Sequence, residues 1–190
     1  MGKKALREDF LYKRSLLPSE VVREKSILIC ENIGKWVQDS SFERCFGYMA
    51  TRNEPSPSSF YEKWAHKLTF ALCRVKGKSQ MEFRRYRPFE PLLKSKMGIL
   101  EPFGDRDHEV LEPCAASFVL VPCVAASKSG VRLGYGGGYY DRYFSGGSKA
   151  ILVGVCFEDF LVDALQAEDH DVKCDFVVTE TRVVSVKEEV

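Results

Sequence analysis

The chain has 190 residues, of which 45% are hydrophobic and 29% are charged. A chain of this length can bury roughly 70% of the surface that its unfolded form exposes, so it needs neither a disulfide nor a metal to fold. The 28 Lys and Arg residues and 27 Asp and Glu residues leave a net charge of +1, which argues against a strongly basic nucleic-acid-binding protein. We expect one domain over residues 1–190, with two very small domains as the alternative.

The N-terminal half predicts two helices and then strands. The helices are expected over residues 3–16 and 19–39, because Leu17-Pro18 interrupts the helical pattern. In the second helix, Ile29, Ile33 and Val37 fall on one stripe, which indicates a buried face. The segments that follow are expected to form a strand, a short helix and a β-hairpin: 45–51, 59–66, 68–75 and 81–86.

The C-terminal half predicts a parallel sheet. Residues 87–116 have no regular pattern, and residues 117–123 then form a short apolar run that is typical of a strand buried on both faces. A loop and a short helix over 139–144 come next, and two further buried strands are expected over 150–157 and 174–179. Helices that alternate with apolar strands indicate an α/β fold with a mostly parallel sheet.

The cysteines and the apolar segments indicate the compartment. The seven cysteines include no CxxC pair, which argues against a zinc site and favours free thiols in a reducing environment. The first ten residues lack the apolar core of a secretory signal, and no apolar stretch reaches the ~18–20 residues that cross a bilayer. We expect a cytoplasmic protein that binds neither membrane nor nucleic acid.

Charge is distributed unevenly along the chain. Residues 1–26 hold seven basic and four acidic residues, residues 74–96 hold eight and two, and residues 156–190 hold three and ten. Solvated faces are one interpretation of these three segments. The other is that the two basic segments bind anions and that part of the acidic segment binds a metal.

The segment Gly134–Gly138 has four glycines in five positions, between an expected strand and an expected helix. Backbone N–H groups converge on anions at such places, and Arg132 and Arg142 add positive charge on either side. No Lys-Ser or Lys-Thr follows the glycines, and Tyr139 holds the place of the last glycine of GxGxxG, so neither standard nucleotide loop is present. A tight structural turn is the alternative.

Residues 132–143, RLGYGGGYYDRY, closely resemble the signature of the 5-formyltetrahydrofolate cyclo-ligase family, also called methenyltetrahydrofolate synthetases. Weaker resemblance covers nearly the whole chain, at residues 3–7, 53–54, 81–83, 98–102, 170–175 and 178–180. It implies a three-layer α/β/α sandwich and an ATP- and Mg²⁺-dependent conversion of 5-formyltetrahydrofolate to 5,10-methenyltetrahydrofolate, with release of ADP and phosphate. It also implies that a reduced folate and ATP are the partners of a monomer or homodimer.

The same resemblance implies the site residues. The ATP set is Lys3, Arg7, Arg132, Gly134, Tyr135, Gly136, Gly137, Gly138, Tyr139 and Tyr140. The folate set is Met49, Glu54, Gly137, Gly138 and Tyr139. Asp141 and Asp171 are the expected Mg²⁺ ligands, and Arg132, Tyr139 and Asp141 the expected catalytic residues.

Residue chemistry fits these roles, although each has a simpler alternative. Lys3 and Arg7 share a helix face and could hold phosphates, or form a solvated basic terminus. Glu54 could accept two hydrogen bonds from the amino–lactam edge of a pterin, or lie in a surface loop. Mg²⁺ needs only one or two protein carboxylates, and Asp171 could instead cap a turn. Arg85 and Arg87 share a strand face and could bind the folate's glutamate tail, or be solvated.

Some positions depart from the family pattern. Ala126-Ser127 stands where Phe-Asp is common, Cys73 and Gln166 replace prolines, and Phe160 replaces a glutamine. These departures concern the walls of the two pockets. A non-catalytic folate- or nucleotide-binding relative of the same fold is therefore the alternative function, and a sugar-phosphate enzyme of related α/β architecture is a third.

Overall fold

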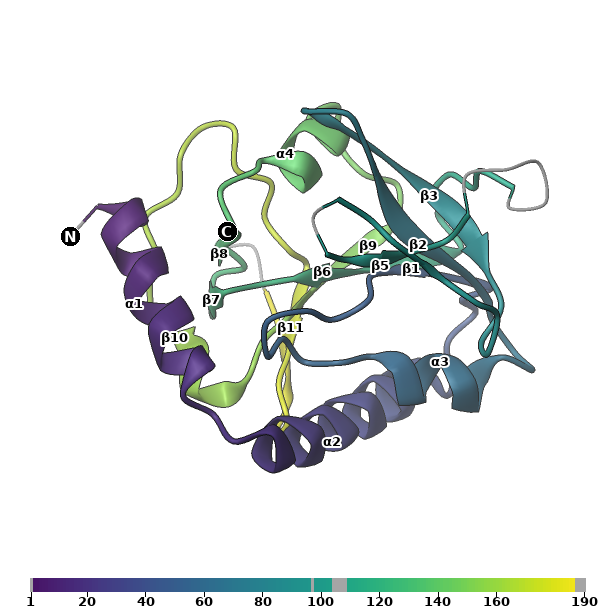
Figure 1. Cartoon of the computed structure of the whole chain (residues 1–190), viewed down its shortest axis with the longest axis horizontal. Coiled ribbons are helices and arrows are strands. Elements are labelled where there is room, and N and C mark those ends of the chain that lie inside the picture. The colour runs from purple at the N-terminus through teal and green to yellow at the C-terminus, as the bar shows by residue number, and fades with distance from the viewer. Residues whose placement is uncertain (1, 97, 104–108, 187–190) are drawn as a thin grey trace.

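The computed structural model describes residues 2–96, 98–103 and 109–186 (Figure 1). The helices are α1 (Lys3–Ser15), α2 (Ser19–Val37), α3 (Ser58–Trp64) and α4 (Tyr139–Tyr143), with a 3₁₀ turn at Glu158–Phe160. The strands are β1 (Arg44–Gly47), β2 (Thr69–Lys76), β3 (Gln80–Tyr86), β4 (Leu93–Lys94), β5 (Leu100–Glu101), β6 (Ser117–Pro122), β7 (Ala125–Ser127), β8 (Arg132–Leu133), β9 (Ile151–Val155), β10 (Leu161–Val162), β11 (Phe176–Val178) and β12 (Val183–Ser185).

A central sheet of seven strands has the order β12-β11-β9-β6-β1-β2-β3. The five inner strands pair in parallel, and the edge strands β3 and β12 pair antiparallel to their neighbours. The mostly parallel sheet that the sequence predicts is therefore confirmed. Parallel strands are covered on both faces, and β6 shows this directly, because Phe118 and Leu120 enter one buried cluster while Val119 and Val121 enter another.

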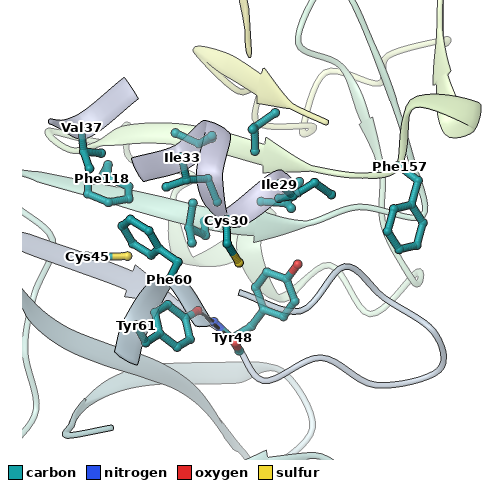
Figure 2. Close-up of a cluster of buried hydrophobic side chains, with 14 of the residues drawn as sticks. Ile29, Cys30, Ile33, Val37, Cys45, Tyr48, Phe60, Tyr61, Phe118 and Phe157 are labelled. Atoms are coloured by element: carbon teal, nitrogen blue, oxygen red, sulfur yellow. Dashed lines mark hydrogen bonds between the residues drawn. The ribbon is translucent and has the colours of Figure 1, made fainter. Parts of the chain in front are cut away.

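Helices cover both faces of this sheet. α2 and α3 lie on one face and α4 on the other, with α1 beside the sheet near β10 (Figure 1). Ile29, Ile33 and Val37 of α2 are at most 1% exposed and gather with Phe60 and Phe118 between helix and sheet (Figure 2). Full burial of an aliphatic side chain contributes roughly 1.5–3 kcal/mol, so the stripe predicted on α2 anchors this layer.

Strand β1 ends four residues earlier than the sequence predicts, and a tyrosine is the reason. The Tyr61 hydroxyl accepts a hydrogen bond from the Tyr48 N–H over 3.1 Å and donates one to the Tyr48 carbonyl over 3.0 Å (Figure 2). The hydroxyl therefore satisfies both backbone polar groups of Tyr48, as a neighbouring strand otherwise would. The chain is therefore free to leave the sheet and enter the loop that holds Glu54.

The loop expected after residue 123 contains β7 and β8, which form a second, three-stranded sheet with β10, in the order β10-β7-β8. Its strands have two or three residues each, which is too short for hydrophobic periodicity to reveal. β8 leads directly into Gly134, so this sheet sets the position from which the glycine-rich segment departs. Within the described residues, no helix is both long and apolar enough to cross a bilayer.

Candidate active site

A cavity of about 750 Å³ opens where β1, β2 and β6 end. Ligand sites of parallel sheets lie beyond the carboxyl ends of the strands, and the loops after β1 and β8 reach the cavity there. Every residue of the ATP, folate, Mg²⁺ and catalytic sets that the resemblance implies lines it: Lys3, Arg7, Met49, Glu54, Arg132, Gly134, Tyr135, Gly136, Gly137, Gly138, Tyr139, Tyr140, Asp141 and Asp171. Lys4 is exposed but borders the same cavity.

The glycine-rich segment has a backbone that side chains would disturb. Gly136 and Gly138 have φ values of +91° and +62°, which disfavour any residue with a Cβ. A Cβ at Gly138 would also lie only 2.7 Å from Arg142 Nη1, whereas one at Gly136 would make an ordinary contact of 3.4 Å with the Arg7 guanidinium. Arg7 Nε donates a hydrogen bond to the Gly134 carbonyl over 2.6 Å. Helix α1 therefore fixes the glycine-rich segment and places the Arg7 guanidinium beside it.

Arg132 and Asp141 form an ion pair of 2.7 Å across the loop. Their side chains are only 7% and 20% exposed. Arg132 Nη1 also donates to the Val172 carbonyl, and Asp141 Oδ1 accepts the Val172 N–H over 3.1 Å. The pair therefore ties the glycine-rich segment to the C-terminal loop, a structural contact that the sequence analysis does not predict.

Asp171 lies at the other side of this loop, where Lys3 Nζ donates to its Oδ2 over 2.5 Å. Burial acts to raise the Asp171 pKa, but the Lys3 bond and the Glu168 N–H outweigh it, so the pKa lies below its ordinary value. Glu168, His170 and Asp171 each place one possible metal-ligand atom within 4.8 Å of the others. Glu168 was missed, because an exposed glutamate in an acidic segment gives no motif.

Glu54 is 4% exposed at the end of the β1 loop. Its Oε2 accepts the Thr51 N–H over 2.8 Å. Burial raises the pKa of Glu54, while the Thr51 N–H, the Tyr135 hydroxyl and the Arg14 charge oppose the rise. The surface-loop alternative for Glu54 is therefore wrong, since the carboxylate is buried and lines the cavity.

The two tyrosines that follow the glycines differ in their surroundings. Tyr139 donates from its hydroxyl to the Lys78 carbonyl over 3.4 Å, and the Arg142 guanidinium lies 5.3 Å from its ring centre. The Tyr140 hydroxyl is buried and has no hydrogen-bond partner within the described part of the chain. A buried hydroxyl without a partner is costly, so Tyr140 offers an unused polar group at the cavity wall.

The basic pair expected to hold a glutamate tail lies elsewhere. Arg85 and Arg87 line a separate cavity of about 340 Å³ beside Thr69, at the opposite end of β2. Arg85 pairs with Glu109 over 3.0 Å and Arg87 with Glu90 over 2.9 Å. These ion pairs and this position do not support tail binding next to the main cavity.

The mostly parallel sheet and the glycine-rich cavity at its carboxyl edge define an α/β protein with a small-molecule site. A model of the 5-formyltetrahydrofolate cyclo-ligase family matches residues 1–180, and the chain belongs to that family. The family and fold expected from the motif at residues 132–143 are thereby confirmed.

Individual relatives agree with this assignment. A 5-formyltetrahydrofolate cyclo-ligase of Mycolicibacterium smegmatis is 32% identical over 112 residues, which cover 54% of this chain and 52% of that protein, or about half of each. A probable 5-formyltetrahydrofolate cyclo-ligase of Caenorhabditis elegans is 28% identical over 162 residues, with 79% and 78% covered. The NMR structure of a 5,10-methenyltetrahydrofolate synthetase of Aquifex aeolicus superposes with a TM-score of 0.85 at 27% identity, covering 100% of this chain and 95% of that one.

Proposed function

We propose that this chain converts 5-formyltetrahydrofolate to 5,10-methenyltetrahydrofolate, using ATP and Mg²⁺ and releasing ADP and phosphate. One observation carries the proposal: the cations, glycines and carboxylates of four separate segments meet around a single cavity of about 750 Å³. Family membership supports the folate as substrate. The seven free cysteines support a reducing compartment, the cytoplasm, and a monomer or homodimer remains our prediction.

The residues present fit a polyphosphate and a metal ion. Lys3 and Arg7 bring positive charge to the glycine-rich segment, and the positive φ values there leave backbone open to a bound anion. Both protein hydrogen bonds to Asp141 use Oδ1, and both to Asp171 use Oδ2. Within the described residues, no hydrogen bond reaches the second oxygen of either carboxylate. Mg²⁺ commonly takes one or two such oxygens and fills its other positions with water and phosphate.

Each side chain then has a defined task. Bound ATP supplies the phosphoryl group that turns the poorly reactive formyl oxygen into a leaving group, so the protein mainly positions partners and stabilises charge. Glu54 orients the pterin by accepting hydrogen bonds from its amino–lactam edge. Lys3 and Arg7 hold phosphates, Asp141 and Asp171 hold the metal, and Arg132 keeps Asp141 in place.

The departures from the family pattern favour an enzyme over a non-catalytic relative. Ala126, Ser127 and Phe160 are buried within the fold, and Gln166 is exposed. None of these four lines the main cavity, whereas Cys73 does. Of these five departures, Cys73 is therefore the one that alters a residue of the cavity wall.

Absorbance at the band of the methenyl product tests the proposal. The purified protein with 5-formyltetrahydrofolate should form that band only when ATP and Mg²⁺ are both present. Calorimetric titration of each ligand should accompany the assay. Binding of the folate or of ATP without any product would identify the non-catalytic relative, and absence of both binding and product would overturn the proposal.

A further inference from the structure

Arg14 is the bulkiest of the almost completely buried side chains among the described residues, at 1% exposure. It extends from the C-terminal half of α1, and it does not itself line the main cavity. Nη2 donates to the Tyr135 hydroxyl, and Nη1 donates to the Cys123 carbonyl over 3.4 Å. Nε has no partner within the described residues. A buried charge is costly unless it is paired. The burial of Arg14 therefore calls for a functional explanation.

Tyr135 connects this buried cation to the cavity. Its ring centre lies 5.3 Å from the Arg14 guanidinium and 5.9 Å from that of Arg52. Its hydroxyl accepts from Arg14, and it lies close enough to the Glu54 carboxylate to lower the pKa of that group. Because the Arg14 donor occupies a lone pair of the hydroxyl, the hydroxyl proton is left for an acceptor such as the Glu54 carboxylate. Arg14, Tyr135 and Glu54 thus form one line of polar groups from the buried cation to the cavity.

The loop that carries Glu54 is also held by the end of α1. Asn53 Nδ2 donates to the carbonyls of Arg14 and Leu17, over 3.3 Å and 3.2 Å. Arg52 and Asn53 both have positive φ values, +50° and +57°, a region that asparagine tolerates but that is uncommon for arginine. The end of α1 therefore contacts the Glu54 loop in two ways. Its backbone carbonyls bind Asn53, and the Arg14 side chain reaches Glu54 through Tyr135.

We propose that Arg14 is a positioning residue for Glu54 and acts through the Tyr135 hydroxyl, which orients the Glu54 carboxylate toward the cavity. This inference rests on the proposed function in one respect only, that Glu54 binds the pterin edge of the folate. Tyr135 lies between two glycines of the loop expected to bind ATP. In this proposal the Tyr135 side chain acts on the folate side of the cavity and not on the ATP side.

The groups that face Glu54 set the direction of the effect. They come from α1, its own loop, the glycine-rich segment, β2 and the residue after β1: Arg14, Arg52, Tyr135, Cys73 and Tyr48. Burial favours the neutral acid, and the cations and the Tyr135 hydroxyl favour the carboxylate. Removing the hydroxyl should therefore raise the Glu54 pKa further, and folate binding should be lost at a higher pH as the solution is acidified.

The experiment compares Tyr135→Phe with Tyr143→Phe. Tyr143 donates to Glu112 over 2.5 Å and lies outside the main cavity. Its substitution therefore removes a tyrosine–carboxylate hydrogen bond at a position that does not contact the cavity. Binding of 5-formyltetrahydrofolate without ATP is measured by calorimetry from pH 8 to pH 5.5. In parallel, ¹³C NMR follows the titration of the Glu54 carboxyl carbon in ligand-free protein, with Glu54→Gln identifying the signal.

We expect Tyr135→Phe to bind the folate about 10- to 100-fold more weakly at neutral pH, because a hydrogen bond to a charged group is lost. Its NMR midpoint and its binding midpoint should both move to higher pH, while Tyr143→Phe matches the wild type. Arg14→Lys keeps the charge but loses the planar fork, and its midpoint should move the same way.

The outcomes separate the inference from the function. If wild-type protein does not bind the folate, the proposed function fails, and the NMR titration alone decides the role of Tyr135. If Tyr135→Phe leaves the NMR midpoint and the folate affinity unchanged, the inference is overturned. If Tyr135→Phe shifts the midpoint but folded Arg14→Lys does not, Tyr135 acts without Arg14, and that overturns the part of the inference that concerns the arginine.

Discussion

The Lys3 ammonium lies 2.5 Å from the Asp171 carboxylate, although 168 positions separate the two residues. Their side chains are 21% and 12% exposed, so solvent screens the pair only in part. The contact brings the first turn of α1 to the C-terminal loop that carries the candidate metal ligand. The N-terminal cations and the C-terminal carboxylates therefore close the main cavity from opposite ends of the sequence.

Replacing Lys3 by alanine should destabilise the protein in a pH-dependent way. The Asp171 pKa lies below its ordinary value, so the pair stabilises the fold above the unfolded-state pKa and this contribution is lost as the pH falls through the folded-state pKa. We expect a loss of about 1 kcal/mol or less at pH 7, and none near pH 2. Urea unfolding at both pH values measures it. Lys13→Ala, which removes an exposed pair with Asp9 on the same helix, should show a smaller difference.

Replacing Asp141 by asparagine should reduce turnover and cost some stability, because the side chains are nearly isosteric but the amide leaves the buried Arg132 cation without its ion partner. Removal of a metal-site contact commonly lowers affinity or activity by at least ~10-fold. The measurements are the Mg²⁺ dependence of product absorbance and the thermal midpoint. Asp163→Asn is the control, because Asp163 is an exposed partner of Lys128 outside the cavity. Equal Mg²⁺ dependence in the two variants, or full activity in EDTA, would refute the metal assignment.

Replacing Glu54 by glutamine should weaken folate binding and spare ATP. The amide would oppose a pterin donor, and an unsatisfied donor costs about 1–3 kcal/mol, or roughly 5- to 150-fold in affinity. The folate KM should rise at constant ATP KM. An unchanged folate KM would return Glu54 to a structural role.

The same Glu54→Gln variant should gain stability at high pH. A folded-state pKa that burial raises means that the ionised carboxylate destabilises the fold and that protonation relieves this as the pH falls. The variant should therefore unfold at a higher urea concentration than the wild type at pH 8, and the difference should shrink toward pH 5. A constant difference across this range would show that the Glu54 charge does not matter for stability.

Replacing Gly136 by alanine should weaken ATP binding more than its effect on the fold explains. Gly136 has φ +91° and faces Arg7, whereas Gly147 has φ +88° with open space around it and lies outside the cavity. Each substitution forces a positive φ on a residue with a Cβ, at about 1–2 kcal/mol. Both variants should lose similar stability in urea, and only Gly136→Ala should lose ATP affinity by calorimetry. Equal ATP affinity would mean that the segment is a structural turn.

Much of the fold could be predicted from local sequence patterns. The apolar run at residues 117–123 and the stripe of Ile29, Ile33 and Val37 predict a buried strand and a packed helix, and both are present. The antiparallel hairpin of β2 and β3 was predicted from its turn residues and is also present. The strands β7, β8, β10 and β12 were missed, because their two or three residues are ordered by pairing partners that the sequence does not identify.

By itself, the sequence determined the family, the fold class and the residue types of the site, because a glycine-rich signature and apolar periodicity are local in the chain. Only the tertiary structure decided which groups act on one another. Three relationships show this: the Arg14–Tyr135 bond beside Glu54, the Arg132–Asp141 pair and the Lys3–Asp171 contact. The paired residues lie from 9 to 168 positions apart along the chain. Hydrogen bonds and charge pairs depend on distances of a few ångströms, and burial, which sets the Glu54 pKa, exists only once the layers have packed.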